Sequence, residues 1–373
     1  MADLITHFST ITDTRKPNGV RHKLIDIIVL AICGVICGAD DWVMIEYFGN
    51  AKREWFETFL ELPHGIPSHD TFGKVFALIN PQEFQASFLD WVGEIAEITS
   101  GQLISIDGKT VRRSHDRTNG KQAIHLVSAW ASRNGIVLGQ VKVDDKSNEI
   151  TAIPELLKML DFHGCIISID AMGTQKEIVS TILERGGDYL LAVKQNQGAL
   201  YDQIEFTYNV DRDNEFEDAP YDYAKTVNKD HGRIETRECW VTSDPEYLNF
   251  IDPDGSWQKL KSLVIIKATR DKEGATSSQI RYFISSADVG AKRMMQFVRK
   301  HWEVENKLHW SLDVTFREDD SRVRIGHAPE NLALIRKMAL NLLRLNKSKK
   351  CGAKTKRMLC AVDTNFLLEI LNS

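Results

Sequence analysis

Two aspartates occupy equivalent places in the chain, each directly after a short run of mainly apolar residues. Asp107 follows Leu-Ile-Ser-Ile and precedes a glycine, and Asp170 follows Ile-Ile-Ser-Ile. A carboxylate at the end of a buried strand is costly unless its charge is paired or bound to a cation. Two carboxylates held close together suit a hard divalent cation such as Mg²⁺ or Mn²⁺. The alternative is that each aspartate caps the loop after its strand; because there are two, we favour the metal site.

A third acidic ligand is expected from a helix that packs against the sheet. Glu305 lies beside an apolar stripe on such a helix, so its carboxylate can reach the sheet edge, with His301 and His309 one turn on either side. A competing interpretation makes His301, Glu305 and His309 a zinc site, but two aspartates already offer hard oxygen ligands. The apolar stripe consists of Phe297, Val298, Val304, Leu308 and Leu312.

The elements that would position these acids follow a defined order between residues 96 and 199. Apolar runs predict strands at 103–106, 124–130, 136–141, 165–169 and 189–193, with helices at 150–160 and 175–185. Asn134-Gly135 predicts a hairpin turn, and Gly186-Gly187 ends the second helix. Three strands, then helix, strand, helix and strand, is the order of the RNase-H-like α/β fold. That fold implies that the first and fourth strands are adjacent and parallel.

The sequence on either side of this core has different patterns. Apolar residues recur at helical spacing before residue 95, interrupted by the Pro-containing break at 62–67, after which Ser68 offers an N-cap. These helices could contact DNA or merely pack together. The expected parts are a helical domain at 1–95 that could bind DNA ends, a first part of the core at 96–199, a mainly β insertion at 200–288, the acidic helix and the helix after it at 289–345, and a basic segment with a terminal helix at 346–373.

A formal net charge of −5 means that any DNA contact must rely on local basic surfaces. Arg233 and Arg237 alternate with His231 and Glu235 onto one face of an expected strand, which is either a DNA contact or a solvated face. The other core candidates are Lys109, Arg112 and Arg113 after the first aspartate and Lys194 after the fifth strand. A second basic group, either a phosphate contact or a solvated loop, comprises Arg344, Lys347, Lys349, Lys350, Lys354, Lys356 and Arg357.

Cysteine usage and hydropathy indicate the compartment. The 6 cysteines are scattered, which favours a reducing environment. No basic-then-apolar signal pattern opens the chain, and the apolar run Ile27–Ala39 is shorter than the roughly 18 residues that span a bilayer. We therefore expect a cytoplasmic protein without a membrane partner.

Several motifs together resemble those of the DDE insertion-sequence transposases, in the branch that includes the H-repeat-associated proteins. The similarity runs over nearly the whole chain, and the set in this order is specific although each motif alone is weak. The motifs are Ile106-Asp107-Gly108-Lys109-Thr110, Ser168-Ile169-Asp170-Ala171, Val193-Lys194-Gln195-Asn196-Gln197, His231-Gly232-Arg233-Ile234-Glu235-Thr236-Arg237 and His301-Trp302-Glu303-Val304-Glu305-Asn306-Lys307-Leu308-His309-Trp310.

The resemblance implies a bacterial, nucleoid-associated enzyme that cleaves and transfers DNA strands. It implies Asp107, Asp170 and Glu305 as the catalytic triad, two Mg²⁺ or Mn²⁺ ions, double-stranded DNA at the element ends and target, and a homodimer on DNA. The broader group carries Tyr-x2-Arg-x3-Glu-x6-Lys on the acidic helix, where this chain has Val298, His301 and Leu312. His301 is then a candidate phosphate contact in place of the arginine. Two alternatives remain open: a nuclease without strand transfer, and an inactive or repurposed DNA-binding protein of the same fold.

Overall fold

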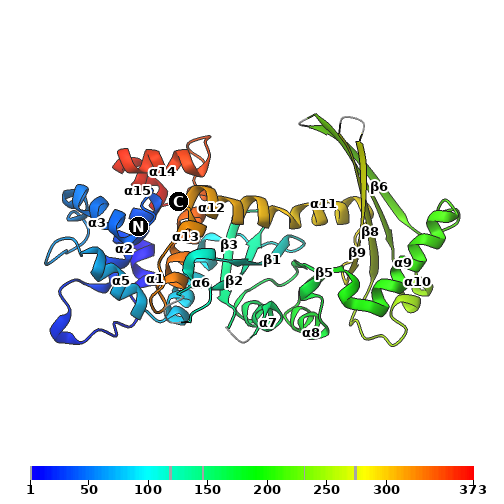
Figure 1. Ribbon diagram of the computed structural model, residues 1–373, viewed down its shortest axis with the longest axis horizontal. Helices are drawn as coiled ribbons and strands as arrows, with labels where there is room; N and C mark the ends of the chain where they lie inside the picture. Colours follow the sequence, from blue (N-terminus) through cyan, green and yellow to red (C-terminus); the bar gives the residue numbers. More distant parts are fainter. Residues whose placement is uncertain (1, 117–119, 145–146, 231, 273–274) are drawn as a thin grey trace. The chain divides into compact units, whose positions relative to one another are not determined.

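The structure is a computed structural model that describes residues 2–116, 120–144, 147–230, 232–272 and 275–373 (Figure 1). Contacts divide the chain into two compact units. Unit 1 comprises Met1–Glu97, Gly108–Asn148 and Glu305–Ser373, and unit 2 comprises Ile98–Asp107 and Glu149–Val304. Two of the chain crossings between the units therefore fall directly beside predicted metal ligands, after Asp107 and before Glu305. Asp107 and Asp170 belong to unit 2, and Glu305 belongs to unit 1.

Unit 2 contains a large mixed sheet. Residues 103–106 of β1 (Leu103–Thr110) pair in parallel with β4 (Ile166–Ile169), which pairs in parallel with β5 (Asp188–Val193). The parallel pairing of the first and fourth strands is thus confirmed. Beyond β5 the sheet is antiparallel and follows the order β9 (Ala275–Ser285), β8 (Ser262–Lys272), β7 (Arg233–Thr242) and β6 (Asp222–Asp230).

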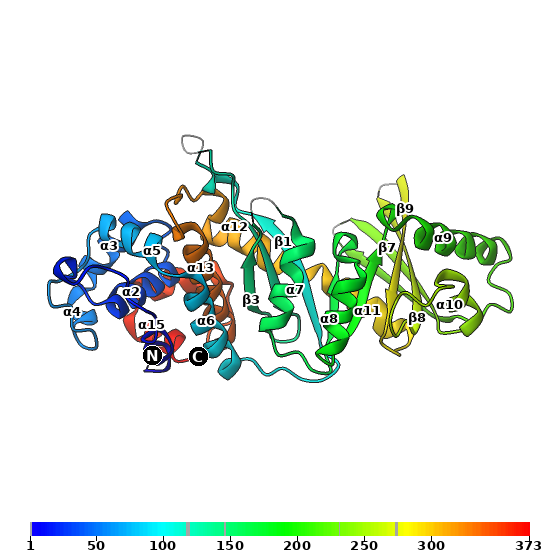
Figure 2. The ribbon, with the colours of Figure 1, turned by 90° about the horizontal axis from the view of Figure 1, so that it is seen from below.

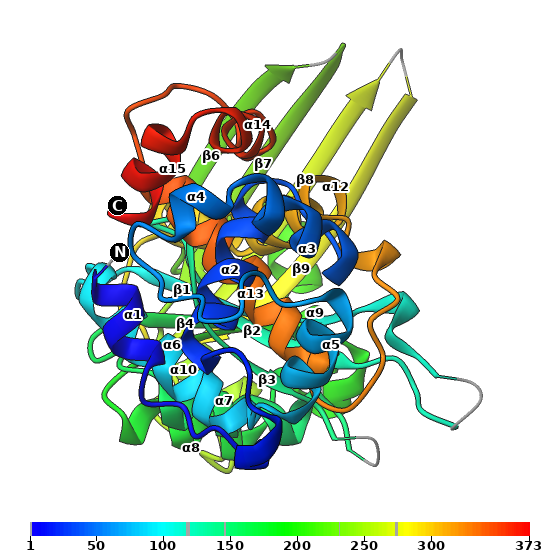
Figure 3. The same cartoon turned by 90° about the vertical axis from the view of Figure 1, so that its left-hand side faces the viewer.

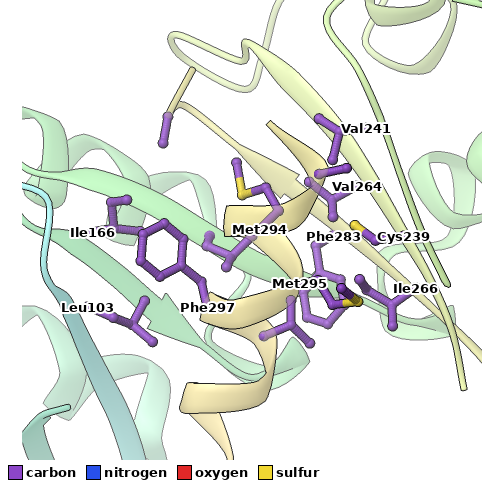
Figure 4. Close-up of a cluster of buried hydrophobic side chains, with 14 residues drawn as sticks. Leu103, Ile166, Cys239, Val241, Val264, Ile266, Phe283, Met294, Met295 and Phe297 are labelled. Atoms are coloured by element: carbon purple, nitrogen blue, oxygen red, sulfur yellow. The ribbon is translucent and has the colours of Figure 1, made fainter. Parts of the chain in front are cut away.

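Helices cover both faces of the parallel strands. Helices α7 (Glu149–Met159) and α8 (Lys176–Glu184) lie side by side on one face (Figure 2), and α11 (Ala291–His301) lies on the other (Figure 1). Side chains alternate along a strand, so Leu103 and Ile166 point to the face that α11 covers. There they pack against Phe297 of α11 in a buried cluster that continues onto β7, β8 and β9 (Figure 4). Burial of this apolar surface fixes α11 against the strands that carry the two aspartates.

The region at 200–288 has more helix than the sequence analysis predicts. Helix α9 (Gly198–Asp213) precedes the strands, and the short helix α10 (Pro245–Ile251) lies between β7 and β8. The buried residues Leu200, Ile204, Tyr208 and Asp211 show that α9 has the helical period, but its polar composition hid the pattern. Strands β6 to β9 make up much of the rest of this region. Because β9 pairs with β5, they extend the core sheet instead of forming a sheet of their own.

Unit 1 combines the beginning and the end of the chain around α13 (Ala328–Leu345). This helix is buried along most of its length and contacts α2, α5 and β3 (Figure 3). The hairpin of β2 (His125–Ala131) and β3 (Ile136–Lys142) turns through residues 132–135, a longer loop than the predicted Asn134-Gly135 turn, and Gly135 adopts φ 70° there. The remaining helices are α1 (Ala2–Phe8), α2 (Leu24–Ile36), α3 (Trp42–Ala51), α4 (Arg53–Phe56), α5 (His69–Leu78), α6 (Pro81–Ile95), α12 (Trp310–Phe316), α14 (Ala353–Val362) and α15 (Thr364–Leu371).

Helix α5 begins where its sequence signal predicts. The Ser68 hydroxyl accepts a hydrogen bond from the backbone N–H of Thr71 and so caps α5. Because α2 and α5 both pack on α13, these helices share a core with the C-terminal part of the chain. Among the described helices, none is both long and apolar enough to cross a membrane.

Candidate active site

The two strand-end aspartates lie at the same edge of the unit 2 sheet. Ile106 of β1 is paired with Ile169 of β4, and Asp107 and Asp170 are the next residue on each strand. Parallel neighbours in this register bring their carboxyl ends together. Both aspartates are partly exposed, as metal ligands in an open site must be. The pair therefore offers hard oxygen atoms from two adjacent strands, which is the donor set that Mg²⁺ or Mn²⁺ prefers.

Asp170 also caps the turn that follows its strand. Its Oδ1 accepts hydrogen bonds from the backbone N–H groups of Met172 (3.0 Å) and Gly173 (3.4 Å), at the start of the 3-10 turn η3 (Ala171–Gly173). The loop-capping alternative is thus correct for this aspartate. It does not exclude a metal ligand, because among the described residues no hydrogen bond to Oδ2 is present. The two N–H groups fix the carboxylate orientation and leave one oxygen for a cation.

Two buried serines lie beneath the aspartates, and sequence reasoning missed them. Ser105 and Ser168 precede Asp107 and Asp170 by two residues, so they share the aspartates' strand faces. The Ser168 hydroxyl donates to Ser105 Oγ (3.1 Å) and lies 2.9 Å from Nδ1 of His301 at the end of α11. The repeated Ile-Ser-Ile before each aspartate was the available signal. These contacts join the last turn of α11 to both aspartate-bearing strands.

His301 is a neutral side chain in this arrangement. Burial lowers its pKa to about 4, and the nearby charge of Arg281 acts in the same direction. Any phosphate contact by His301 would therefore use a neutral imidazole, unlike the charged arginine of the broader group. Nδ1 is directed at Ser168, so Nε2 is the ring nitrogen left for a phosphate or a metal ion, and this contact does not decide between the DNA and zinc interpretations.

Glu305 lies in a π-helical turn, not in a continuous α-helix. The predicted helix that carries the apolar stripe from Phe297 to Leu312 is interrupted after α11 by η5 (Val304–His309), and α12 follows. Such turns insert an extra residue per turn and occur frequently at functional sites. Within unit 1, the exposed carboxylate of Glu305 is 3.0 Å from Nδ1 of the buried His309. His309 therefore orients Glu305, while burial lowers the pKa of His309 although the carboxylate acts to raise it.

A hollow of about 360 Å³ in unit 1 brings Glu305 together with the end of β1. Gly108, the residue directly after Asp107, lines this hollow. The hollow therefore opens where the chain leaves the first predicted ligand. Its other lining residues are Lys109, Thr110, Arg112, His125, Glu305, His309, Asp313 and Asp319.

Lys109 is held by carboxylates of its own unit. Its ammonium group lies 2.6 Å from Asp313, 3.0 Å from Glu318 and 3.2 Å from Asp319. Burial alone would lower the pKa of Lys109, but the charges of Glu318 and Asp313 outweigh it and raise the pKa. An acidic run such as Glu318-Asp319-Asp320 ordinarily indicates a solvated loop, but Glu318 is buried. DNA phosphate would have to compete with three carboxylates for this lysine.

The other basic candidates of the core are more accessible. Arg112 and Arg113 make surface ion pairs with Asp319 (3.2 Å) and Asp320 (3.4 Å), which are weak and leave both guanidinium groups solvated. Lys194 is exposed at the end of β5. Arg233 and Arg237 share one face of β7, as predicted, and His231 lies outside the described residues.

The C-terminal basic residues divide into internal and exposed groups, which the sequence analysis did not anticipate. The Arg357 guanidinium donates to the Val35 carbonyl and to Asp40, and it stacks on the Phe316 ring at 4.3 Å. The Lys356 ammonium donates to two carbonyls at the end of α13, and the Arg344 guanidinium lies 4.6 Å from the centre of the Trp130 ring. Lys347, Lys349, Lys350 and Lys354 are exposed.

Family models and related proteins match this chain over almost its whole length. Residues 99–342 match the family model described as "Transposase DDE domain", and residues 5–92 match the model described as "DDE_Tnp_1-associated". The chain is 46% identical over 374 residues to "Putative transposase YncI" of Escherichia coli O157:H7, covering 99% of this chain and 94% of that protein. It is 41% identical over 372 residues to "H repeat-associated putative transposase YhhI" of Escherichia coli (strain K12), covering 99% and 97%.

A solved structure is also similar at low identity. It is a piggyBac transposase in a synaptic complex with hairpin DNA, which matches with a TM-score of 0.45 and 12% identity, covering 100% of this chain and 79% of that chain. The family assignment rests on the sequence matches, which extend over almost the whole chain. The chain belongs to the DDE transposases, in the branch of the H-repeat-associated proteins.

Proposed function

We propose that this protein cleaves DNA at the ends of an insertion sequence and joins those ends to target DNA, with Asp107, Asp170 and Glu305 as the ligands of two Mg²⁺ or Mn²⁺ ions. The observation that carries the proposal is the parallel register of β1 and β4, in which Asp107 and Asp170 follow a paired Ile106 and Ile169. Glu305 shares a hollow with Gly108, the residue directly after Asp107. An RNase-H-like core is the fold that we propose for these elements.

The carboxylates of Asp170 and Glu305 are oriented by different groups. Asp170 is oriented by the N–H groups of η3, and Glu305 is oriented by His309. The Ser168–His301 contact holds the end of α11 on β4, four residues before Glu305. When bound, a pair of divalent ions would polarise the scissile phosphate and lower the pKa of the attacking water. The protein's own contribution is to fix the ligand oxygens before DNA arrives.

The reaction has two chemical steps. In the first, water attacks a phosphorus atom at the element end, and the P–O3′ bond breaks to leave a 3′-hydroxyl group. In the second, that hydroxyl attacks a phosphodiester of the target, forming one P–O bond while another breaks. The balance of bonds makes the second step possible without an external energy source. We propose that the protein acts as a homodimer on double-stranded DNA. His301 would contact the DNA backbone as a neutral group, and Lys109 would do so only after losing one of its carboxylate partners. The other proposed backbone contacts are Arg112, Arg113, Lys194, Arg233 and Arg237.

The test is a cleavage and joining assay on DNA that carries the flanking ends of the element. Asp107→Asn, Asp170→Asn and Glu305→Gln should each abolish both products in Mg²⁺, while Asp213→Asn, an exposed acid on α9, should behave like the wild type. EDTA should have the same effect as the triad substitutions. Cleavage without joined product would favour the nuclease alternative, and retention of full cleavage by Glu305→Gln would assign the third ligand to another acid.

A further inference from the structure

One face of the β7–β8–β9 ladder changes from apolar to basic along the strands. Near the α11 helix, Cys239 of β7 and Ile266 of β8 point to this face and pack in the buried cluster with Met295. The register pairs Cys239 with Ile266, and Ile266 with Arg281 of β9. Arg281 therefore stands on the same face at the border of the cluster. Further along, the charged and polar residues that point to this face include Arg233, Glu235 and Arg237 of β7, Arg270 and Lys272 of β8, and Ser277 and Gln279 of β9.

A single buried carboxylate holds these arginines together. Glu235 is 2.6 Å from the Arg237 guanidinium and 3.0 Å from that of Arg270. Burial would raise the pKa of Glu235, but the charges of Arg270, Arg237 and Arg233 outweigh it and lower the pKa. Burial, with added repulsion from Arg270 and Arg237, lowers the pKa of Arg281. Among the described side chains of this face, one carboxylate therefore lies among four guanidinium groups, and their summed charge is positive.

Trp302 completes the cluster at its inner border. The Arg281 guanidinium lies 4.7 Å from the centre of the Trp302 ring, a cation–π contact, and Trp302 is 47% exposed. A guanidinium that stacks on an indole keeps its N–H groups directed outward in the ring plane. Its side chain is also already ordered, so less entropy is lost when an anion binds.

We infer that Arg237, Arg270, Arg281 and Trp302 form a binding site for the phosphates of a DNA backbone, apart from the predicted metal ligands. The inference rests on the proposed function and adds a DNA contact surface to it. Guanidinium groups bind phosphate through two parallel hydrogen bonds, and this cluster has more positive charge than its carboxylate neutralises. The neighbouring side chains on the face are Asn228, Ser277 and Gln279, which suit a polar backbone better than an apolar protein surface.

The experiment compares two double variants of the full chain. Arg270→Gln with Arg281→Gln removes two charges from the cluster and leaves Glu235 paired with Arg237. Lys229→Gln with Lys267→Gln removes two charges from the opposite face of β6 and β8 and is the matched control. Binding to a 30-base-pair duplex of random sequence is measured in EDTA, which prevents cleavage, between 0.05 and 0.3 M salt. A thermal melt verifies that each variant is folded.

The arginine variant should bind the duplex roughly tenfold to 100-fold more weakly at 0.1 M salt, with a salt exponent smaller by about 2, since each phosphate contact contributes about 0.9. The control should stay close to the wild type. Equal losses in both variants, or a loss in neither, would overturn the site. Competition by inorganic phosphate that matches competition by DNA at equal phosphate concentration would also overturn it in favour of a free-anion site. A wild-type protein that does not bind the duplex would instead contradict the proposed function.

Discussion

Two basic regions of this transposase, one in each unit, differ in what their charges do. In unit 1, Arg344, Lys356 and Arg357 bind carbonyl groups and aromatic rings of their own unit. In unit 2, Arg237, Arg270 and Arg281 surround a single carboxylate on an open strand face. A run of basic residues therefore does not identify a DNA contact by itself. Whether a basic side chain is available to DNA depends on how many carboxylate and carbonyl groups already bind it.

Lys109 gives the largest expected effect for the internally paired group. Lys109→Met would leave Glu318 buried without its nearest ion-pair partner, and loss of one partner of a buried pair costs about 3–5 kcal/mol. We expect the free energy of unfolding in urea to fall by about this amount, and Arg112→Met, which removes an exposed surface pair, to cost less than about 1 kcal/mol. If Lys109→Met leaves the stability unchanged but weakens DNA binding, Lys109 is a DNA contact after all.

Arg357 tests the same comparison inside the C-terminal segment. Arg357→Met would remove the donors for the Val35 carbonyl and for Asp40, and it should destabilise the protein by about 2–4 kcal/mol. Lys354→Met, three residues earlier and exposed, is the matched control and should change the stability by less than about 0.5 kcal/mol. A chemical denaturation curve for each variant measures the difference. Equal stabilities would mean that the Arg357 contacts contribute nothing net.

The sequence predicted the positions of the two aspartates better than the surroundings of the acidic helix. Strand ends are local features, and the same four residues, Ile-Ser-Ile-Asp, occur at the end of both strands in the printed chain. The parallel pairing followed from the expected fold and is confirmed by the register. The π-helical turn at Glu305 was not predictable, because its residues have ordinary helical periodicity and the extra residue appears only in the backbone hydrogen bonds.

Contacts between distant segments were also beyond sequence reasoning. Glu318 and Lys109 are far apart in the chain, so the acidic group at 318–320 resembled a solvated loop. The same holds for α5, where Ser68 was identified as the cap but Glu46 was not identified as the partner of His69 (2.6 Å). Because α2 and α5 pack on α13, removing the first 95 residues would expose the apolar side of α13. Recognition of element ends by these helices is therefore better tested with point substitutions than with a truncation.

His301 should make stability depend on pH in one direction. Its pKa is lowered to about 4 in the folded protein, so between pH 6.5 and about 4 the unfolded chain binds more protons than the folded one. The contribution of neutral His301 to the free energy of unfolding is therefore complete above pH 6.5 and is lost as the pH falls toward 4. Other histidines titrate in the same window, so the measurement is the difference between the wild type and His301→Gln. That difference should shrink between pH 7 and pH 5. A constant difference would show that His301 is not buried as a neutral group.

The exposed C-terminal lysines should give the smallest effect. Replacing Lys349, Lys350 and Lys354 together by glutamine should weaken binding to all DNA sequences about equally, by less than tenfold at 0.1 M salt. The reason is that no ion pair or ring contact among the described residues orders these three lysines, so they act through the screened field. Titrations with element-end and random duplexes measure both affinities. A larger loss than that of the Arg270 and Arg281 double variant would reverse the comparison between the two basic regions.

The most direct test of the proposed metal site is the binding of Mn²⁺ itself, followed by electron paramagnetic resonance without DNA. We expect Asp107→Asn, Asp170→Asn and Glu305→Gln each to weaken or abolish binding, and Asp213→Asn to bind Mn²⁺ like the wild type. Each triad variant removes one carboxylate from the proposed ligand set, whereas Asp213 lies exposed on α9. Equal Mn²⁺ binding by the wild type and all three triad variants would contradict the assignment of these residues as metal ligands.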